Sequence, residues 1–182
     1  FGGERPKAIY FSKRVNESPA DGDDICGHFD IVESLDYEAE LGVIIGKDAK
    51  DVPLEDVKNY IFGYTVINDI SARNIQTAHK QWYFGKSLDG FTPMGPCILT
   101  ADEVEYPPVL KITAKVNGEL RQNSTTDLLI TDIDHIVHEL SKGITLKAGT
   151  IIATGTPSGV GMGMNPPCFL KDGDIVECKI EK

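Results

Sequence analysis

The chain has 182 residues, of which 41% are hydrophobic and 25% charged, a composition ordinary for one globular domain with its own core. Its formal net charge of −10 argues against a nucleic-acid partner and against an anionic membrane surface, because both attract basic faces. No apolar stretch approaches the about 20 residues that a membrane helix needs, and no signal-peptide pattern is present, so we expect a cytoplasmic protein. The four cysteines form no Cys-x-x-Cys pair, which favours reduced thiols.

The first third of the chain predicts two strands, a loop and a short helix. Residues 7–14 have the composition of a short strand, whereas proline, glycine and aspartate interrupt any period over 15–30. The apolar run that follows predicts a strand over roughly 37–46. The segment 52–61 allows a short helix, because it carries a proline where a first helical turn accepts one.

The middle of the chain predicts a strand followed directly by a helix. Residues 62–69 alternate between apolar and polar side chains, and the strand is expected to stop at Asp69. Residues 71–81 can form a helix with Ser71 as its N-cap. Asp69 is therefore expected at a strand end, where functional side chains often gather.

The last part of the chain is also rich in predicted strands. Residues 94–100 and 110–123 are predicted strands, and Asn117-Gly118 is a strong signal for a hairpin turn within the second. Residues 132–143 form an amphipathic pattern that predicts a helix. Two final strands are predicted over 149–155 and 172–181. The whole pattern predicts one domain of the α+β class, predominantly β, with a few short helices.

Two glutamates stand out within the apolar run "LDYEAELGVIIGK". In a strand, Glu38 and Glu40 point to one face, whereas Ala39 and Leu41 point to the other. Two ionised carboxylates about 4 Å apart repel by roughly 4 kcal/mol at an effective dielectric of about 20. One carboxylate then takes a proton, or a cation binds between them. The alternative is an edge strand on which both glutamates face solvent.

A third carboxylate, Asp69, favours a bound cation over the solvated edge. Carboxylates that converge from two strands suit Mg²⁺ or Mn²⁺, which prefer oxygen ligands. Neither segment contains histidine or cysteine, so zinc is less favoured. Asp69 could instead form a local hydrogen bond at a turn.

Other polar residues allow a functional and a structural interpretation. Lys86 could donate to a developing oxyanion beside a metal, or be a solvated lysine. Arg73 and Gln76 share a helical face, so they could clamp a substrate carboxylate or merely coat the helix. The glycine-rich segment 155–167 lacks dinucleotide-binding spacing, but it could offer backbone N–H groups to an anion or form an ordinary turn.

Five motifs together give the chain a specific resemblance. They are "DYEAELGVIIGK", "GYTVINDISARNIQ", "QWYFGKSLDGFTPMGP", "VNGELRQ" and "TGTPSGVG". In this order and spacing they resemble the fumarylacetoacetate hydrolase family over nearly the whole chain. The resemblance implies a single catalytic domain over 1–182 with a mixed, rolled β-sandwich fold, and a homodimer.

The resemblance also implies roles for individual residues. The Mg²⁺ or Mn²⁺ ligands of the family correspond to Glu38, Glu40 and Asp69. Its active-site lysine corresponds to Lys86. Its substrate-binding residues correspond to Arg73, Gln76 and Thr156, of which the threonine contacts the substrate carboxylate.

Members of this family act on small 2-oxo acids and their enols, often in aromatic catabolism. The resemblance therefore implies a metal-dependent enzyme. Its reaction would be C–C bond hydrolysis of the acylpyruvate or fumarylpyruvate type, or isomerisation or decarboxylation of the 2-hydroxyhepta-2,4-diene-1,7-dioate isomerase type.

One family feature has no counterpart in this chain. Hydrolases of the family carry a His-x-x-Glu pair in an N-terminal lid or lobe, and none occurs here. Because the sequence begins with Phe1, we expect this lobe to be missing from the chain. Two alternatives remain: a catalytically silent paralogue that binds metal or an oxo acid, and an accessory protein without a ligand.

Overall fold

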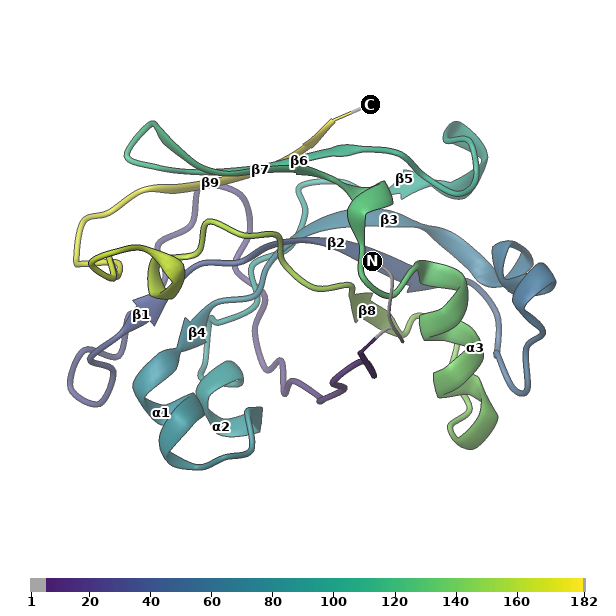
Figure 1. Ribbon diagram of the computed structural model, residues 1–182, viewed down its shortest axis with the longest axis horizontal. Coiled ribbons are helices and arrows are strands. Elements are labelled where there is room, and N and C mark those ends of the chain that lie inside the picture. Colours follow the sequence, from purple (N-terminus) through teal and green to yellow (C-terminus); the bar gives the residue numbers. More distant parts are fainter. Residues whose placement is uncertain (1–5, 182) are drawn as a thin grey trace.

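Two antiparallel sheets stack on each other in the computed structural model, which describes residues 6–181 (Figure 1). Residues 1–5 and 182, which the predicted domain over 1–182 includes, lie outside the described part. The four-stranded sheet has the order β5 (Leu99–Thr100), β3 (Ile61–Asn68), β2 (Ala39–Ile45) and β8 (Ile151–Ala153). The three-stranded sheet has the order β7 (Glu119–Thr125), β6 (Lys111–Val116) and β9 (Val176–Glu181). A short pair joins β1 (Leu35–Asp36) to β4 (Ser71–Ala72).

The helices are few and short, as predicted. The α-helices are α1 (Arg73–Ala78), α2 (Tyr83–Lys86) and α3 (Ile133–Gly143). The 3₁₀-helices are η1 (Leu54–Tyr60), η2 (Ala101–Glu103), η3 (Thr126–Leu128) and η4 (Gly161–Gly163). In Figure 1, α1, α2 and α3 lie on the side of the four-stranded sheet that faces away from the three-stranded sheet. None of the described helices is both long enough and apolar enough to span a membrane.

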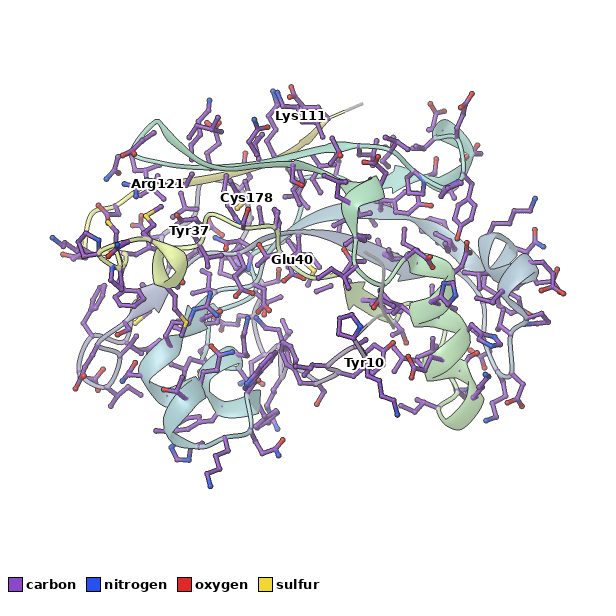
Figure 2. The ribbon with its side chains drawn as sticks, viewed as in Figure 1. Tyr10, Tyr37, Glu40, Lys111, Arg121 and Cys178 are labelled. Carbon is purple, nitrogen blue, oxygen red and sulfur yellow. The ribbon has the colours of Figure 1, made fainter. Side chains whose placement is uncertain are left out.

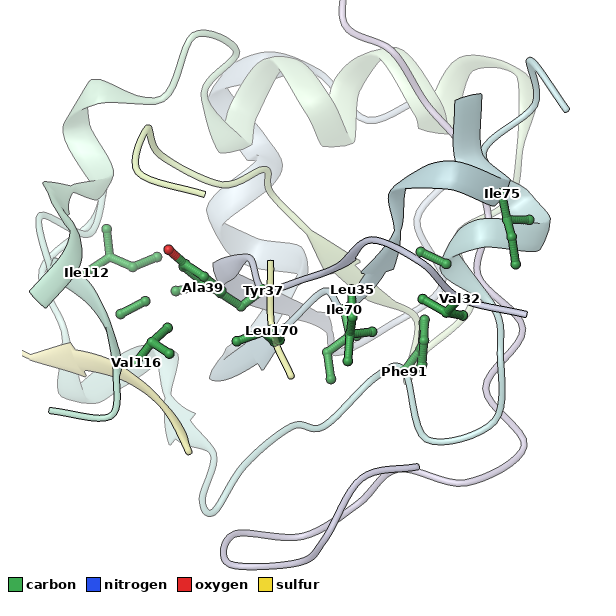
Figure 3. Close-up of a cluster of buried hydrophobic side chains, with 12 residues drawn as sticks. Val32, Leu35, Tyr37, Ala39, Ile70, Ile75, Phe91, Ile112, Val116 and Leu170 are labelled. Atoms are coloured by element: carbon green, nitrogen blue, oxygen red, sulfur yellow. The ribbon is translucent and has the colours of Figure 1, made fainter. Parts of the chain in front are cut away.

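Strand β2 is an interior strand that pairs with β3 along one edge and with β8 along the other, and every residue of it is buried, so both of its faces are covered. Leu41, Val43 and Ile45 belong to one apolar cluster, and each such side chain stabilises the fold by about 1.5–3 kcal/mol. Ala39 belongs to a second cluster, which includes side chains of β6 (Figure 3). Glu40 is only 3% exposed on the opposite face. The solvent-facing edge strand considered above is therefore wrong.

Three local predictions differ from the structure. Residues 7–14 form no strand, and Lys13 from this segment enters the acidic cluster described below. Ser71 is not a helix cap, because it belongs to β4, which pairs with β1. The Ser71 hydroxyl donates to the Asp69 carbonyl oxygen over 3.0 Å. Helix α1 therefore begins only at Arg73. Of the predicted strand over 94–100, only Leu99–Thr100 pairs as a strand.

Other local predictions are confirmed because nearby residues determine them. Strands β6 and β7 form a hairpin at Asn117-Gly118, whose φ angles of 52° and 80° suit asparagine and glycine. Helix α3 begins after Asp132, whose side chain accepts a hydrogen bond from the His135 N–H over 2.9 Å. All four cysteines are free thiols, as expected.

Candidate metal centre

Three carboxylates converge where β2 begins and β3 ends. Ala39 pairs with Asn68 across these antiparallel strands, so Glu38 and Asp69 lie side by side just beyond the pairing. Glu38, Glu40 and Asp69 each offer one oxygen, and these oxygens all lie within 4.8 Å of one another. All three side chains are buried. The structure therefore brings together the three carboxylates selected from the sequence.

Lys86 lies between two of these carboxylates. Its Nζ is 2.7 Å from Glu38 Oε2 and 2.7 Å from Asp69 Oδ2, and the residue is 2% exposed. Burial acts to lower the pKa of Lys86, but the charges of Asp69 and Glu38 outweigh it and the pKa is raised. Lys86 is therefore a fixed ammonium inside the acidic cluster.

Gly85 allows Lys86 to reach this position. A Cβ atom at Gly85 would lie 2.6 Å from the backbone nitrogen of Gln76 and 2.9 Å from the Ala72 carbonyl oxygen. Only glycine therefore lets the four-residue helix α2 pack directly against α1. The approach of the two helices carries Lys86 towards the end of β3.

Lys13, which is not among the site residues predicted from the sequence, is a second ammonium group at the cluster. Its Nζ donates to Asp69 Oδ1, and also to the Phe91 carbonyl oxygen over 2.8 Å. Burial lowers the pKa of Lys13 more than the neighbouring Asp69 raises it. A single lysine in a segment without a clear period gives no signal in the sequence.

Glu40 is neutralised in a different way. Among residues 6–181, no ammonium or guanidinium group forms an ion pair with it, and its Oε2 accepts a hydrogen bond from the Gly155 N–H over 2.7 Å. Figure 2 shows Glu40 near the middle of the molecule. Burial, followed by the charges of Asp69 and Glu38, raises its pKa to about 8. The repulsion expected between neighbouring carboxylates is thus relieved both by cations and by a proton.

Arg73 and Gln76 are directed into the protein. Arg73 Nη1 donates to Gln76 Oε1 over 3.1 Å, and Nη2 lies 2.6 Å from Glu38 Oε1. Arg73 Nε donates to Asp36 Oδ2 over 2.9 Å. Both residues are buried, so the interpretation that they coat a solvated helix is wrong. Their role as substrate-binding residues stays a prediction.

Thr156 is tied to the backbone of β2. Its hydroxyl donates to the Ala39 carbonyl oxygen over 3.0 Å and accepts from Gln122 Nε2 over 2.8 Å. Gln122 is fully buried, and its Oε1 accepts from the Ala39 N–H over 2.9 Å. Gln122 ends the motif "VNGELRQ" but is not among the site residues predicted from the sequence. A contact between Thr156 and substrate stays a prediction.

The glycine-rich segment offers its N–H groups to an anion that belongs to the chain. Asp36 Oδ1 accepts from the Gly161 N–H over 2.7 Å, and Oδ2 accepts from the Met162 N–H over 3.0 Å. Asp36 is not among the predicted site residues, because a single aspartate at this point of the sequence has no distinctive pattern.

The donor set fits a hard divalent cation. The cluster supplies only carboxylate oxygens, which Mg²⁺ and Mn²⁺ prefer. Glu40 is the member without a cationic partner among the described residues, so a metal there would neutralise a carboxylate that otherwise keeps its proton. Glu38, Glu40 and Asp69 are the residues that would hold the metal.

Comparison with known proteins identifies the class of protein to which this fold and site belong. The family profile "Fumarylacetoacetate (FAA) hydrolase C-terminal" matches residues 3–182. The chain belongs to the fumarylacetoacetate hydrolase family.

Relatives of the chain carry the names of several enzymes. Oxaloacetate tautomerase YisK of Bacillus subtilis is 46% identical over 173 residues, which are 95% of this chain and 58% of that protein. A fumarylacetoacetate hydrolase of Exiguobacterium antarcticum has the same fold, with a TM-score of 0.91 and 45% identity over 97% of this chain and 63% of that one. Fumarylpyruvate hydrolase of Pseudomonas aeruginosa, solved with Mn²⁺ and pyruvate, gives a TM-score of 0.80 and 32% identity over 91% and 70% of the two chains.

These comparisons confirm the family and the fold that the motifs implied. The chain spans about three fifths of the length of the first two relatives. Their names describe those longer proteins.

Proposed function

We propose that Glu38, Glu40 and Asp69 bind Mg²⁺ or Mn²⁺ and that the protein acts on small 2-oxo acids or their enols. The observation that carries this proposal is the convergence of three buried carboxylate oxygens within 4.8 Å of one another. The P. aeruginosa relative supports it, because its structure contains Mn²⁺ together with pyruvate, a 2-oxo acid.

The bound metal would act as a Lewis acid that stabilises negative charge on an enolate oxygen. The protein residues have separate tasks. Lys86 holds Glu38 and Asp69 in place and can donate to an oxygen that gains negative charge. Lys13 has a lowered pKa, which makes it the better of the two lysines for moving a proton.

Keto–enol tautomerisation is the first reaction that we propose to test, because the B. subtilis relative is named an oxaloacetate tautomerase. C–C bond hydrolysis is the second, because the P. aeruginosa relative is named a fumarylpyruvate hydrolase. Both reactions produce negative charge on an oxygen beside a carboxylate, so one metal site can serve either. We also propose a homodimer, which rests on the family resemblance and can be measured by light scattering.

The test uses the chain after removal of metal with a chelator. Enol-to-keto conversion of oxaloacetate and cleavage of fumarylpyruvate are followed with and without added Mn²⁺. We expect turnover only with the metal. We also expect Asp69→Asn to weaken Mn²⁺ binding by more than about 100-fold, because loss of a residue that only supports the metal ligands typically weakens it by about 10- to 100-fold. Full activity of metal-free Asp69→Asn would refute the proposal. Mn²⁺ binding without turnover would favour the silent paralogue.

The control is Asp134→Asn. Asp134 is a carboxylate outside the cluster that accepts a hydrogen bond from the Tyr106 hydroxyl. This variant makes the same chemical change and should keep Mn²⁺ binding.

A further inference from the structure

We infer that Asp36 is a positioning residue that fixes Glu38 through Arg73 and anchors the glycine-rich loop 155–163 beside Glu40. The inference rests on the proposed function, because Glu38 and Glu40 are proposed metal ligands. Asp36 itself lies outside the carboxylate cluster and is not a ligand in this scheme.

The Asp36 carboxylate is fully buried and holds four donors. Its Oδ1 accepts from the N–H groups of Tyr37 over 3.0 Å and Gly161 over 2.7 Å. Its Oδ2 accepts from Arg73 Nε over 2.9 Å and from the Met162 N–H over 3.0 Å. Each oxygen therefore has two hydrogen bonds, so the carboxylate has one orientation. Bonds of this kind, with a charged partner, are short and strong.

The guanidinium of Arg73 carries this orientation to Glu38. The group is planar and rigid, so fixing Nε on Asp36 and Nη1 on Gln76 also sets the direction of Nη2. Nη2 lies 2.6 Å from Glu38 Oε1, and Lys86 holds the other oxygen of the same carboxylate. Loss of the bond at Nε would therefore release one of the two contacts that orient Glu38.

The second route runs through the loop. A Cβ atom at Gly161 would lie 2.2 Å from the Cys168 carbonyl oxygen and 2.8 Å from Asp36 Oδ1, so the loop can approach Asp36 only with glycine there. The other end of this loop contains Gly155, whose N–H donates to Glu40 Oε2. Asp36 thus anchors the far end of the loop that contacts Glu40.

The experiment measures Mn²⁺ affinity by titration calorimetry, for the wild type, Asp36→Asn, Arg73→Lys and the double variant. Asparagine keeps the shape of aspartate but turns an NH₂ group towards an N–H donor. We expect Asp36→Asn to raise the Kd for Mn²⁺ by about 10- to 100-fold, the range for residues that support metal ligands. We expect the double variant to lose less affinity than the two single losses combined, because both changes disrupt the route through Arg73, and to bind more weakly than Arg73→Lys alone, because Asp36→Asn also disrupts the route through the loop.

Asp134→Asn is again the matched control. Its melting temperature should fall, because a neutral amide oxygen accepts a weaker bond from the Tyr106 hydroxyl than a carboxylate does, while its Kd stays within about twofold of the wild type, as expected for a site outside the network. A change in stability alone would move the melting temperature of both variants but the Kd of neither.

The outcomes separate the inference from the proposed function. If the wild type does not bind Mn²⁺, the proposed function fails and the inference with it. If the wild type binds and Asp36→Asn binds equally well, only the inference is overturned. If Asp36→Asn does not fold, the Mn²⁺ affinity of Arg73→Lys supplies the test. Lysine keeps the positive charge of arginine but lacks the planar guanidinium that bonds Asp36, Gln76 and Glu38 together. Unchanged Mn²⁺ affinity in that variant, or strictly additive losses in the double variant, would rule out the route through Arg73.

Discussion

The backbone N–H of Asp69 donates to the carbonyl oxygen of Glu38 over 2.8 Å. This bond continues the pairing of β2 and β3 by one step beyond their ends, so it fixes the backbones that carry two of the three carboxylates. The backbone of the acidic cluster is therefore held by strand pairing.

Replacing Lys86 should destabilise the metal-free protein strongly. Lys86→Met would leave Glu38 and Asp69 without the ammonium that lies 2.7 Å from both. Loss of one partner from a buried ion pair costs about 3–5 kcal/mol. Arg73 still pairs with Glu38 and Lys13 with Asp69 in this variant, so that range is the upper bound of the loss that urea unfolding measures. The control is Lys115→Met, because Lys115 forms an exposed pair with Glu177 that is worth about 0–1 kcal/mol. Equal losses in the two variants would contradict a special role for Lys86 in balancing the cluster.

A methyl group at position 85 should disturb both stability and the position of Lys86. In Gly85→Ala the new Cβ would lie 2.6 Å from the backbone nitrogen of Gln76, and such overpacking costs about 1–3 kcal/mol. Gly143→Ala is the matched control, since its Cβ would meet no atom within 4 Å at the end of α3. The control should be neutral or more stable by about 0.4–1 kcal/mol. Thermal unfolding compares the two variants with the wild type. A Gly85→Ala protein as stable as the wild type would disprove the close packing of α2 on α1.

The stability of the metal-free protein should fall as the pH rises from about 4.5 to about 8. The unfolded chain releases the Glu40 proton near the ordinary pKa of 4.5, whereas burial and the charges of Asp69 and Glu38 keep it bound in the folded protein to about pH 8. Between these values the folded protein binds more protons, so the free energy of unfolding decreases with pH. Urea unfolding across this window measures the slope. Glu40→Gln should flatten it, and an unchanged slope in that variant would show that Glu40 is not responsible.

The cysteines should react with a thiol reagent in two phases. Cys26, Cys97 and Cys168 are exposed, whereas burial in β9, aided by the charge of Glu177, raises the pKa of Cys178 to about 12. The thiolate is the reactive form, so the half-buried Cys178 should react with Ellman's reagent at neutral pH more slowly than the three exposed cysteines. Cys178→Ser should lose the slow phase and keep the fast one. Four equally fast thiols in the native wild type would contradict this assignment.

Features that depend on neighbouring residues could be read from the sequence. Asn117-Gly118 predicts its hairpin because these residues tolerate positive φ angles at little cost. The alternation of a strand places Glu38 and Glu40 on one face without knowledge of the rest of the fold. The strand predicted over 7–14 is wrong because a local sequence pattern carries no information about contacts with distant residues. It could not show that the Lys13 side chain bonds to Asp69.

The sequence by itself determined the family, through its motifs, and the identity of the acidic residues that converge. Only the tertiary structure decided how their charge is balanced: by Lys13 and Lys86 at Asp69, by Arg73 and Lys86 at Glu38, and by a proton at Glu40. The physical reason is that a charged side chain in an unfolded chain is satisfied by water and needs no particular partner. Burial removes that water, so each charge must find a partner from a distant segment, and the choice depends on which segments the fold brings together.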